Sequence, residues 1–216
     1  MRVKICGLRS RAEVAAAARC GADYVGLVFF PKSPRCLSLA DAKWIADGAP
    51  EGLVRVALTV DADDELLEAL LAEVAIDMLQ LHGAESPDRV AEIRQRYGLP
   101  IMKAVALAEA GDLDAVRDYA RTADQILVDA RPVAGAERPG GNGVAFDWHL
   151  LEGMSWPVPW MLAGGLTPEN VAEAVRLTGA GQVDVSSGVE HAPGYKDRER
   201  IAAFVRAAKA AEPATV

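Results

Sequence analysis

The sequence is poor in cysteine and lacks the residue spacings that hold metal ions. Its three cysteines, Cys6, Cys20 and Cys36, are too far apart to form the paired ligands of a zinc site. They also leave an odd thiol, which is typical of proteins in a reducing compartment. We therefore expect a cytoplasmic protein without a bound metal.

Long apolar runs and an excess of positive charge are also missing. No apolar stretch approaches the length of a membrane span, and the first residues are already strand-like, so we expect neither a membrane segment nor a signal peptide. The chain has 23 Lys and Arg against 31 Asp and Glu, a net charge of −8, which argues against a nucleic-acid surface. An anionic ligand would have to be attracted by local N–H groups, because the overall charge would repel it.

The chain does contain a regular alternation of strand-like and helix-like segments. Helix starts are marked by a capping box at Ser10–Glu13 and by the Ser86-Pro87 pair. Short apolar runs predict strands at residues 2–5, 23–29, 54–60, 78–81, 101–105, 125–128, 161–163 and 183–185. Helical spacing and caps predict helices near residues 11–21, 40–46, 66–74, 87–98, 113–119, 146–151, 167 onward and 201–208.

Eight strand–helix units in 216 residues indicate an α/β fold with parallel strands and helical crossovers. A closed (β/α)8 TIM barrel fits this number and length. An open doubly wound sheet is the alternative, but its glycine fingerprint would follow the first strand, where this chain has Cys6-Gly7-Leu8. No linker-like segment divides the chain, so we expect one domain covering residues 1–216.

Two consecutive strand ends are rich in glycine and serine. Gly164-Gly165 follow one apolar run, and Ser186-Ser187-Gly188 follow the next. Glycine has no Cβ, so backbone N–H groups stay accessible there, and Thr167 is predicted to cap the intervening helix. Such donors at helix N-termini favour a phosphate group. Two ligand-free turns are the alternative interpretation.

The carboxyl ends of the strands carry the catalytic groups of a (β/α)8 barrel. Alternation along the strands puts Cys6, His82, Asp129 and Asp184 on one face, and we expect them, with Lys103, to point into the barrel. Cys6 is a candidate base and Asp129 a candidate acid. Above a phosphate site, this pair suits proton transfer on a phosphosugar and needs no metal.

Each of these residues also has a simpler interpretation. A lone Cys6 is more often a small buried hydrophobe, and Asp129 could cap a helix or pair with a lysine. His82 could be structural, although its neighbours favour a place beside the substrate. Arg35, in a Pro-braced loop, is either a solvated charge or a bidentate carboxylate ligand. Lys103 could form a Schiff base, but interior lysines are more often ion-paired.

Taken together, the motifs resemble the phosphoribosylanthranilate isomerase family of tryptophan biosynthesis. They occur in order over nearly the whole chain, and their combination is far more specific than any one of them. They are Lys4-Ile5-Cys6-Gly7-Leu8, Gly21-Ala22-Asp23-Tyr24-Val25-Gly26, Phe30-Pro31-Lys32-Ser33-Pro34-Arg35, Gln80-Leu81-His82-Gly83, Lys103-Ala104-Val105, Leu127-Val128-Asp129, Gly140-Gly141-Asn142-Gly143, Phe146-Asp147-Trp148, Ala163-Gly164-Gly165-Leu166, Val183-Asp184-Val185-Ser186-Ser187-Gly188-Val189-Glu190 and Pro193-Gly194-Tyr195-Lys196-Asp197.

The resemblance implies an Amadori rearrangement of N-(5-phosphoribosyl)anthranilate without a cofactor. Asp129 would protonate the ring oxygen, Cys6 would remove the C2′ proton, and Arg35 would face the anthranilate carboxylate. His82 and Asp184 would lie near the substrate. The phosphate would be held by Gly164, Gly165, Ser186, Ser187 and Gly188. The chain would act as a monomer or a homodimer, with residues 140–143 forming a lid.

Three other functions compete with this interpretation. A histidine-pathway phosphosugar isomerase, or a dual-specificity barrel, has similar chemistry but would place an Asp where this chain has Cys6. A non-catalytic phosphosugar-binding barrel would keep the phosphate site and lose the acid–base pair. A Schiff-base aldolase would depend on Lys103.

Overall fold

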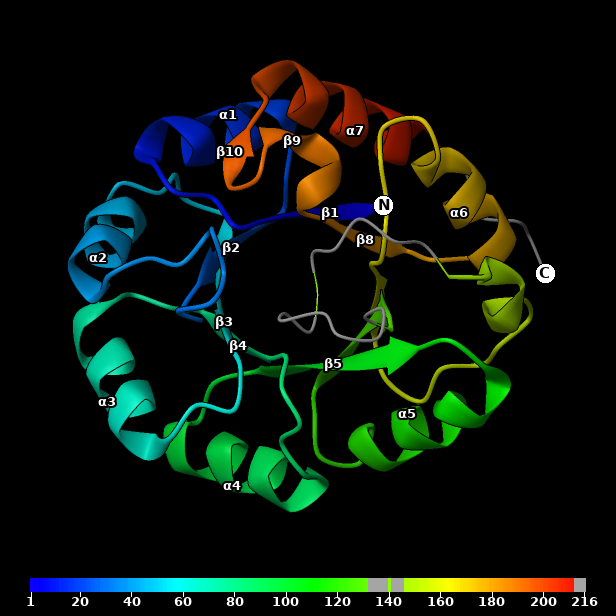
Figure 1. Ribbon diagram of the computed structural model, residues 1–216, viewed down its shortest axis with the longest axis horizontal. Helices are drawn as coiled ribbons and strands as arrows, with labels where there is room; N and C mark the ends of the chain where they lie inside the picture. Colours follow the sequence, from blue (N-terminus) through cyan, green and yellow to red (C-terminus); the bar gives the residue numbers. More distant parts are fainter. Residues whose placement is uncertain (132–139, 141–145, 212–216) are drawn as a thin grey trace.

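Eight parallel strands close into a barrel in which each strand pairs with the next and β8 pairs with β1 (Figure 1). The computed structural model describes residues 1–131, 140 and 146–211. This architecture confirms the predicted (β/α)8 fold and rules out the open doubly wound sheet. The strands are β1 (Arg2–Cys6), β2 (Tyr24–Val28), β3 (Val54–Thr59), β4 (Met78–Leu81), β5 (Ile101–Leu107), β6 (Gln125–Ala130), β7 (Trp160–Leu162) and β8 (Gln182–Val185).

Helices surround the ring of strands (Figure 1). The α-helices are α1 (Arg11–Cys20), α2 (Leu39–Asp47), α3 (Asp64–Glu73), α4 (Pro87–Tyr97), α5 (Leu113–Tyr119), α6 (Val171–Thr178) and α7 (Arg198–Ala210). Short 3-10 helices are η1 (Ala110–Asp112), η2 (Trp148–Leu151) and η3 (Ser187–Val189). The segment predicted as a helix at residues 146–151 is the 3-10 helix η2.

The predicted helix caps of α1 and α4 are present. Ser10 Oγ accepts from the backbone N–H of Glu13 at 3.2 Å, and the Glu13 carboxylate reaches back to the N–H of Arg9 at 2.5 Å. Ser86 caps α4 in the same way, with Pro87 as the first helical residue. These side chains satisfy amide groups that have no partner within the helix, which fixes where each helix begins.

The predicted start of α6 was wrong by about one turn. The helix begins at Val171 and not directly after Thr167. The Thr167 hydroxyl accepts from the N–H of Glu169 at 3.2 Å, while the Thr167 N–H donates to the Asn170 side chain at 2.7 Å. These reciprocal bonds close a separate turn, so the cap-like pattern marks that turn and the helix follows it.

A two-stranded antiparallel hairpin, β9 (Glu190–Ala192) with β10 (Tyr195–Lys196), follows η3 and was not predicted. Strands of two or three residues are too short to show the alternation that reveals longer strands. Gly194 makes the turn with a φ of +83°, a conformation that favours glycine.

Alternation along the strands separates two apolar cores. The smaller core fills the barrel interior, and its buried members are Tyr24, Val56, Met102, Ala104, Leu127, Met161 and Ala163. The larger core lies between the strands and the helices, where Phe204 of α7 is fully buried. The interior core supports the site from below, and the outer core holds each helix against the barrel.

Truncating Phe204 tests how far α7 anchors the barrel. We expect Phe204→Ala to lower the free energy of unfolding by about 3–5 kcal/mol, because it removes a fully buried ring from the outer core. Urea denaturation measures this change. Arg206→Ala, at an exposed position of the same helix, is the matched control and should change it by less than about 0.5 kcal/mol. Similar effects of the two substitutions would contradict this account of the core.

Candidate active site

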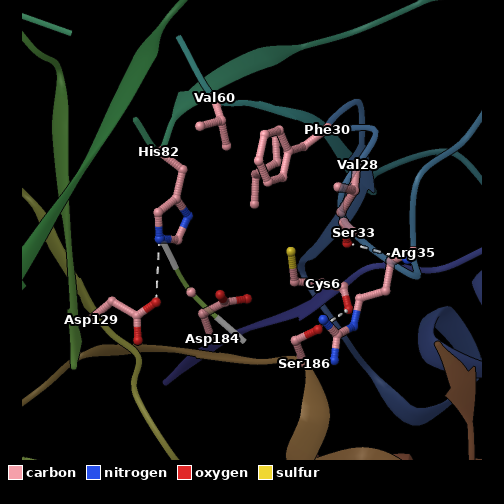
Figure 2. A pocket seen from close by; sticks show the side chains of 12 residues that line it. Cys6, Val28, Phe30, Ser33, Arg35, Val60, His82, Asp129, Asp184 and Ser186 are labelled. Carbon is pink, nitrogen blue, oxygen red and sulfur yellow. Dashed lines mark hydrogen bonds and ion pairs between the residues drawn. The ribbon is translucent and has the colours of Figure 1, made fainter. Parts of the chain in front are cut away.

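A pocket opens at the carboxyl ends of the strands (Figure 2). Strands β1, β2, β3, β6 and β8 contribute to its wall, together with the segments that follow β2, β3, β4, β6 and β8. The lining residues are Cys6, Val28, Phe30, Ser33, Arg35, Leu58, Val60, His82, Asp129, Gly140, Asp184 and Ser186. The five side chains that we expected to meet the substrate, Cys6, Arg35, His82, Asp129 and Asp184, therefore lie around one space.

Cys6 is the last residue of β1, and its thiol points into the pocket (Figure 2). Its neighbour on β2 is Gly26, where a Cβ atom would lie 2.7 Å from the Cys6 sulfur. Glycine at this position leaves the space that the thiol occupies. Burial raises the pKa of the Cys6 thiol, and the nearby Lys4 ammonium offsets only part of that rise.

Asp129, from β6, faces His82, which directly follows β4 (Figure 2). The Asp129 Oδ2 atom lies 3.3 Å from His82 Nε2, and Oδ1 accepts from the N–H of Ala130 at 2.8 Å. The Gln80 amide nitrogen, 3.0 Å from His82 Nδ1, can only donate. With the amide oriented this way, a neutral His82 carries its proton on Nε2, facing the Asp129 carboxylate.

Gly140 covers this pair so closely that a larger residue there would force the two side chains to move. A Cβ atom at Gly140 would lie 2.6 Å from Asp129 Oδ2 and 2.8 Å from His82 Nε2. This approach places the first residue of the predicted lid directly over the Asp129 side chain. The rest of that motif, residues 141–143, lies outside the described residues.

Asp184, from β8, is paired with a lysine inside the barrel. Lys4 Nζ donates to Asp184 Oδ1 at 3.0 Å, and the lysine side chain is fully buried. Burial by itself would lower the pKa of Lys4, but attraction to the Asp184 carboxylate outweighs it and raises the Lys4 pKa. Lys4 thus pairs with Asp184 and not with Asp129, which leaves Asp129 facing His82.

Lys103 does not point into the barrel, and that expectation was wrong. It lies between the interior residues Met102 and Ala104, so alternation turns its side chain outward to the helix layer. There its Nζ atom donates to the Glu85 carboxylate at 2.7 Å and to the carbonyls of Gly83 and Leu81 at 2.7 and 3.3 Å. Three acceptors match the three donors of an ammonium, so Lys103 is a buried ion-pair residue rather than a Schiff-base nucleophile.

Arg35 lines the pocket but is not a solvated charge, since only 4% of its surface is exposed. Its Nε and Nη2 atoms donate to the two carboxylate oxygens of Glu190 at 2.7 and 2.8 Å. Glu190 also accepts from Lys196 Nζ at 2.7 Å. Burial would raise the pKa of Glu190, but the two cations lower it to about 2. Glu190 and Lys196 both stand in motifs that carry the family resemblance, yet composition and spacing gave them no role.

The two Gly/Ser-rich segments lie against each other. Gly164 and Gly165 have φ angles of +85° and +64°, and a Cβ atom at Gly188 would lie 1.9 Å from the carbonyl oxygen of Leu166. The Ser186 hydroxyl donates to the carbonyl of Cys6 at 3.1 Å, which ties this corner to β1. The two segments are therefore neighbours, and phosphate binding there stays a prediction.

Within residues 1–131, 140 and 146–211, no cluster of three or more His, Cys, Asp or Glu side chains has a metal-binding arrangement. None of the helices in these same ranges combines the length and the apolar character that crossing a membrane requires.

Comparison with known proteins gives consistent matches along the chain. The family described as N-(5′phosphoribosyl)anthranilate (PRA) isomerase matches residues 3–207. The chain is 65% identical over 209 residues to the N-(5′-phosphoribosyl)anthranilate isomerase of Cereibacter sphaeroides, covering 97% of this chain and 99% of the relative. It is 57% identical over 211 residues to the enzyme of that name from a Ruegeria species, covering 97% and 98%.

Solved structures agree with the sequence matches. Phosphoribosyl anthranilate isomerase from Thermotoga maritima superposes with a TM-score of 0.87 at 35% identity, covering 97% of this chain and 98% of that one. A structure of monomers of the dimeric Thermotoga maritima enzyme gives 0.84 at 34%, with the same coverage. A third, in complex with reduced 1-(o-carboxyphenylamino)-1-deoxyribulose 5-phosphate, gives 0.82 at 33%, again covering 97% and 98%.

The environment of Cys6 predicts how its thiol titrates. Because burial raises its pKa above the ordinary 9.0, we expect the rate of Cys6 alkylation by iodoacetamide to rise at a higher pH than that of N-acetylcysteine in the same solution. Mass spectrometry of the Cys6 peptide gives the rate at each pH, and the midpoint does not depend on how accessible the thiol is. A midpoint at or below that of the free thiol would contradict the burial argument.

Proposed function

This chain belongs to the N-(5′-phosphoribosyl)anthranilate isomerase family, and on that premise we propose that Cys6 and Asp129 perform its acid–base chemistry. The reaction is the Amadori rearrangement of N-(5′-phosphoribosyl)anthranilate to 1-(2-carboxyphenylamino)-1-deoxyribulose 5-phosphate in tryptophan biosynthesis. The observation that carries the assignment is that a thiol from β1 and a carboxyl group from β6 line the same pocket.

Asp129 is the acid of the first step. It protonates the ring oxygen of the ribose, the C1′–O bond breaks, and the anthranilate nitrogen, which keeps its hydrogen, forms a protonated imine with C1′. The placement of the carboxyl group supports this role, because it lies at the mouth of the barrel and His82 Nε2 lies 3.3 Å away. A proton on that nitrogen stabilises the carboxylate that remains after Asp129 has given up its own proton.

Cys6 is the base of the second step. Its thiolate removes the proton from C2′, and the electrons of that C–H bond move towards the imine to give an enolamine. The enolamine then tautomerises to the ketose product. The Lys4 and Lys196 ammonium groups favour the thiolate electrostatically, while burial makes it a strong base.

The rest of the pocket holds the two ends of the substrate. Arg35 binds the anthranilate carboxylate, and the apolar side chains of Phe30 and Val60 flank the aromatic ring. Asp184 and His82 lie near the sugar. The phosphate binds to the backbone N–H groups of the Gly164-Gly165 and Ser186-Ser187-Gly188 segments, which contact each other beside α6.

The competing functions differ in ways that one set of assays separates. Isomerase activity is read from the change in anthranilate fluorescence when the protein is added to freshly made phosphoribosylanthranilate. Activity in this assay excludes a binding barrel without catalysis. The histidine-pathway phosphosugar, assayed beside it, tests dual specificity, and Cys6 at the end of β1 favours a single substrate.

The setting of this activity follows from the same premise. We infer that the chain works as a single domain in the cytoplasm, where the thiols of Cys6, Cys20 and Cys36 stay reduced. A monomer or a homodimer fits the description of the Thermotoga maritima enzyme as dimeric with monomeric forms. Size-exclusion chromatography with light scattering distinguishes the two states.

Substituting the acid and the base separates catalysis from binding. We expect Cys6→Ala and Asp129→Asn each to lower kcat at least about a hundredfold, while affinity for the product changes only a few-fold. The reason is that these groups transfer protons during the reaction and contribute little to binding. Turnover is measured by fluorescence and affinity by calorimetry. Cys20→Ala, at the outer end of α1, is the matched thiol control and should leave both values unchanged. Normal turnover in either test variant would remove that residue from the mechanism.

A negative charge tests the phosphate segment. We expect Gly165→Asp to raise KM at least about tenfold, because a carboxylate there repels the substrate phosphate. Gly179→Asp is the control. Gly179 has a φ of +69°, similar to the +64° of Gly165, and a Cβ atom at Gly179 would meet nothing within 4 Å. Equal KM values for the two variants would argue that the phosphate binds elsewhere.

A further inference from the structure

Arg35 is held from several sides before any ligand arrives. Two of its guanidinium nitrogens, Nε and Nη2, are paired with Glu190, and its backbone N–H donates to Ser33 Oγ at 3.2 Å. Its side-chain stem lies on Gly7, where a Cβ atom would come within 2.4 Å of Arg35 Cδ. The fork that would bind a carboxylate edge-on is thus largely occupied by the protein, and Nη1 has no partner within the described residues.

This pairing creates an electrostatic problem for anion binding. A bidentate arginine–carboxylate pair has no net charge, so its attraction for a second carboxylate is much weaker than that of an unpaired guanidinium. Glu190 is itself 8% exposed, so water does not weaken its effect on the pocket. Arg35 with Glu190 alone would therefore be a poor site for an anionic aromatic acid.

Lys196 supplies the missing charge. Its side chain is buried, and its Nζ atom donates to Glu190 Oε1 at 2.7 Å, to the Ser186 carbonyl at 3.0 Å and to Ser186 Oγ at 3.2 Å. Three acceptors match the three donors of an ammonium group. With Lys196 charged, the three side chains carry a net charge of +1, although burial lowers the Lys196 pKa.

The unpredicted hairpin builds this arrangement. Glu190 begins β9 and Lys196 ends β10, so antiparallel pairing brings the two side chains together. The turn between them contributes the Gly194 N–H, which donates to Glu190 Oε2 at 3.1 Å. A Cβ atom at Gly194 would lie 2.7 Å from the carbonyl of Pro34, so the hairpin also packs on the loop that carries Arg35.

We propose that Lys196 and Glu190 are positioning residues for recognition of the substrate's aromatic carboxylate. Glu190 fixes the plane of the Arg35 guanidinium, and Lys196 balances Glu190 so that one positive charge remains for the ligand. This inference rests on the proposed function, in which Arg35 faces that carboxylate. Through these two residues, the β9–β10 hairpin makes the pocket select a carboxylated aromatic ring over an uncarboxylated one.

Binding of two ligands that differ only in the carboxylate tests this proposal. One is reduced 1-(2-carboxyphenylamino)-1-deoxyribulose 5-phosphate, and the other is its phenylamino counterpart. We expect the wild-type chain to bind the carboxylated ligand more tightly. In Lys196→Met the ratio of the two affinities should fall at least about tenfold, because only the binding of the carboxylated ligand weakens. Calorimetry measures both affinities without turnover, so an effect of Lys196 on Cys6 does not enter.

A second-site variant distinguishes charge balance from a structural role. In Glu190→Gln/Lys196→Met, Arg35 keeps its positive charge, and the carboxylate that cancels this charge is gone. We therefore expect the double variant to prefer the carboxylated ligand at least about threefold more strongly than Lys196→Met does. Glu199→Gln, an exposed change of the same kind on the adjoining α7, is the control and should leave the preference intact. Circular dichroism verifies that each variant is folded.

Each outcome bears on the inference. Equal weakening of both ligands by Lys196→Met, or a double variant worse than the single one, would mean that Lys196 only supports the fold and would overturn the proposal. A wild-type chain that turns over its substrate but binds both ligands equally would also overturn it. The comparison measures binding alone. A wild-type chain without isomerase activity would therefore count against the proposed function, while the two ligand affinities would still test the roles of Lys196 and Glu190.

Discussion

Parallel pairing of β1 with β8 closes the barrel and joins residues about 180 positions apart in the sequence. Arg2–Ile5 align with Gln182–Val185, which places Lys4 beside Asp184 inside the barrel and lets the Ser186 hydroxyl reach the carbonyl of Cys6. All eight strands run in one direction, so their carboxyl ends meet at one rim. The thiol and the carboxyl group share a pocket because of this closure, and an open sheet would leave β1 and β8 apart.

The buried ion pairs lie in two parts of the barrel. Lys103 with Glu85 lies on the helix side of the barrel and fastens the segment after β4 to β5. Lys4 with Asp184 and the Arg35–Glu190–Lys196 group face the pocket end of the barrel instead. Taking charges out of water costs free energy that a pair regains only when its hydrogen bonds are complete. Because of that cost, a buried ionisable side chain that has no lysine or arginine partner among the described residues, such as Asp129 beside His82, is a candidate functional group.

An acidic protein that binds an anionic substrate depends on local fields. The chain has a net charge of −8, yet Arg35 lines the pocket and Lys196 is joined to it through Glu190. Burial strengthens these short-range interactions relative to the distant surface carboxylates, which solvent screens. Contacts between segments far apart in the sequence, such as those of Glu190 and Lys196 with Arg35 and with each other, therefore decide the charge at this side of the pocket.

The sequence by itself determined the strand–helix alternation, the barrel, the family and the residues at the strand ends, because these follow from local periodicity and from motifs contiguous in the chain. Cys6, His82 and Asp129 were found at strand ends, and Asp184 by alternation along its strand and by the family resemblance. Only the tertiary structure decided which charges pair. In the structure Lys103 points out to Glu85, and Lys4 pairs with Asp184. Arg35 contacts Glu190, 155 residues further along the chain, and Glu190 in turn contacts Lys196. Pairing of buried charges depends on distances between segments remote in sequence, and no local pattern records those distances.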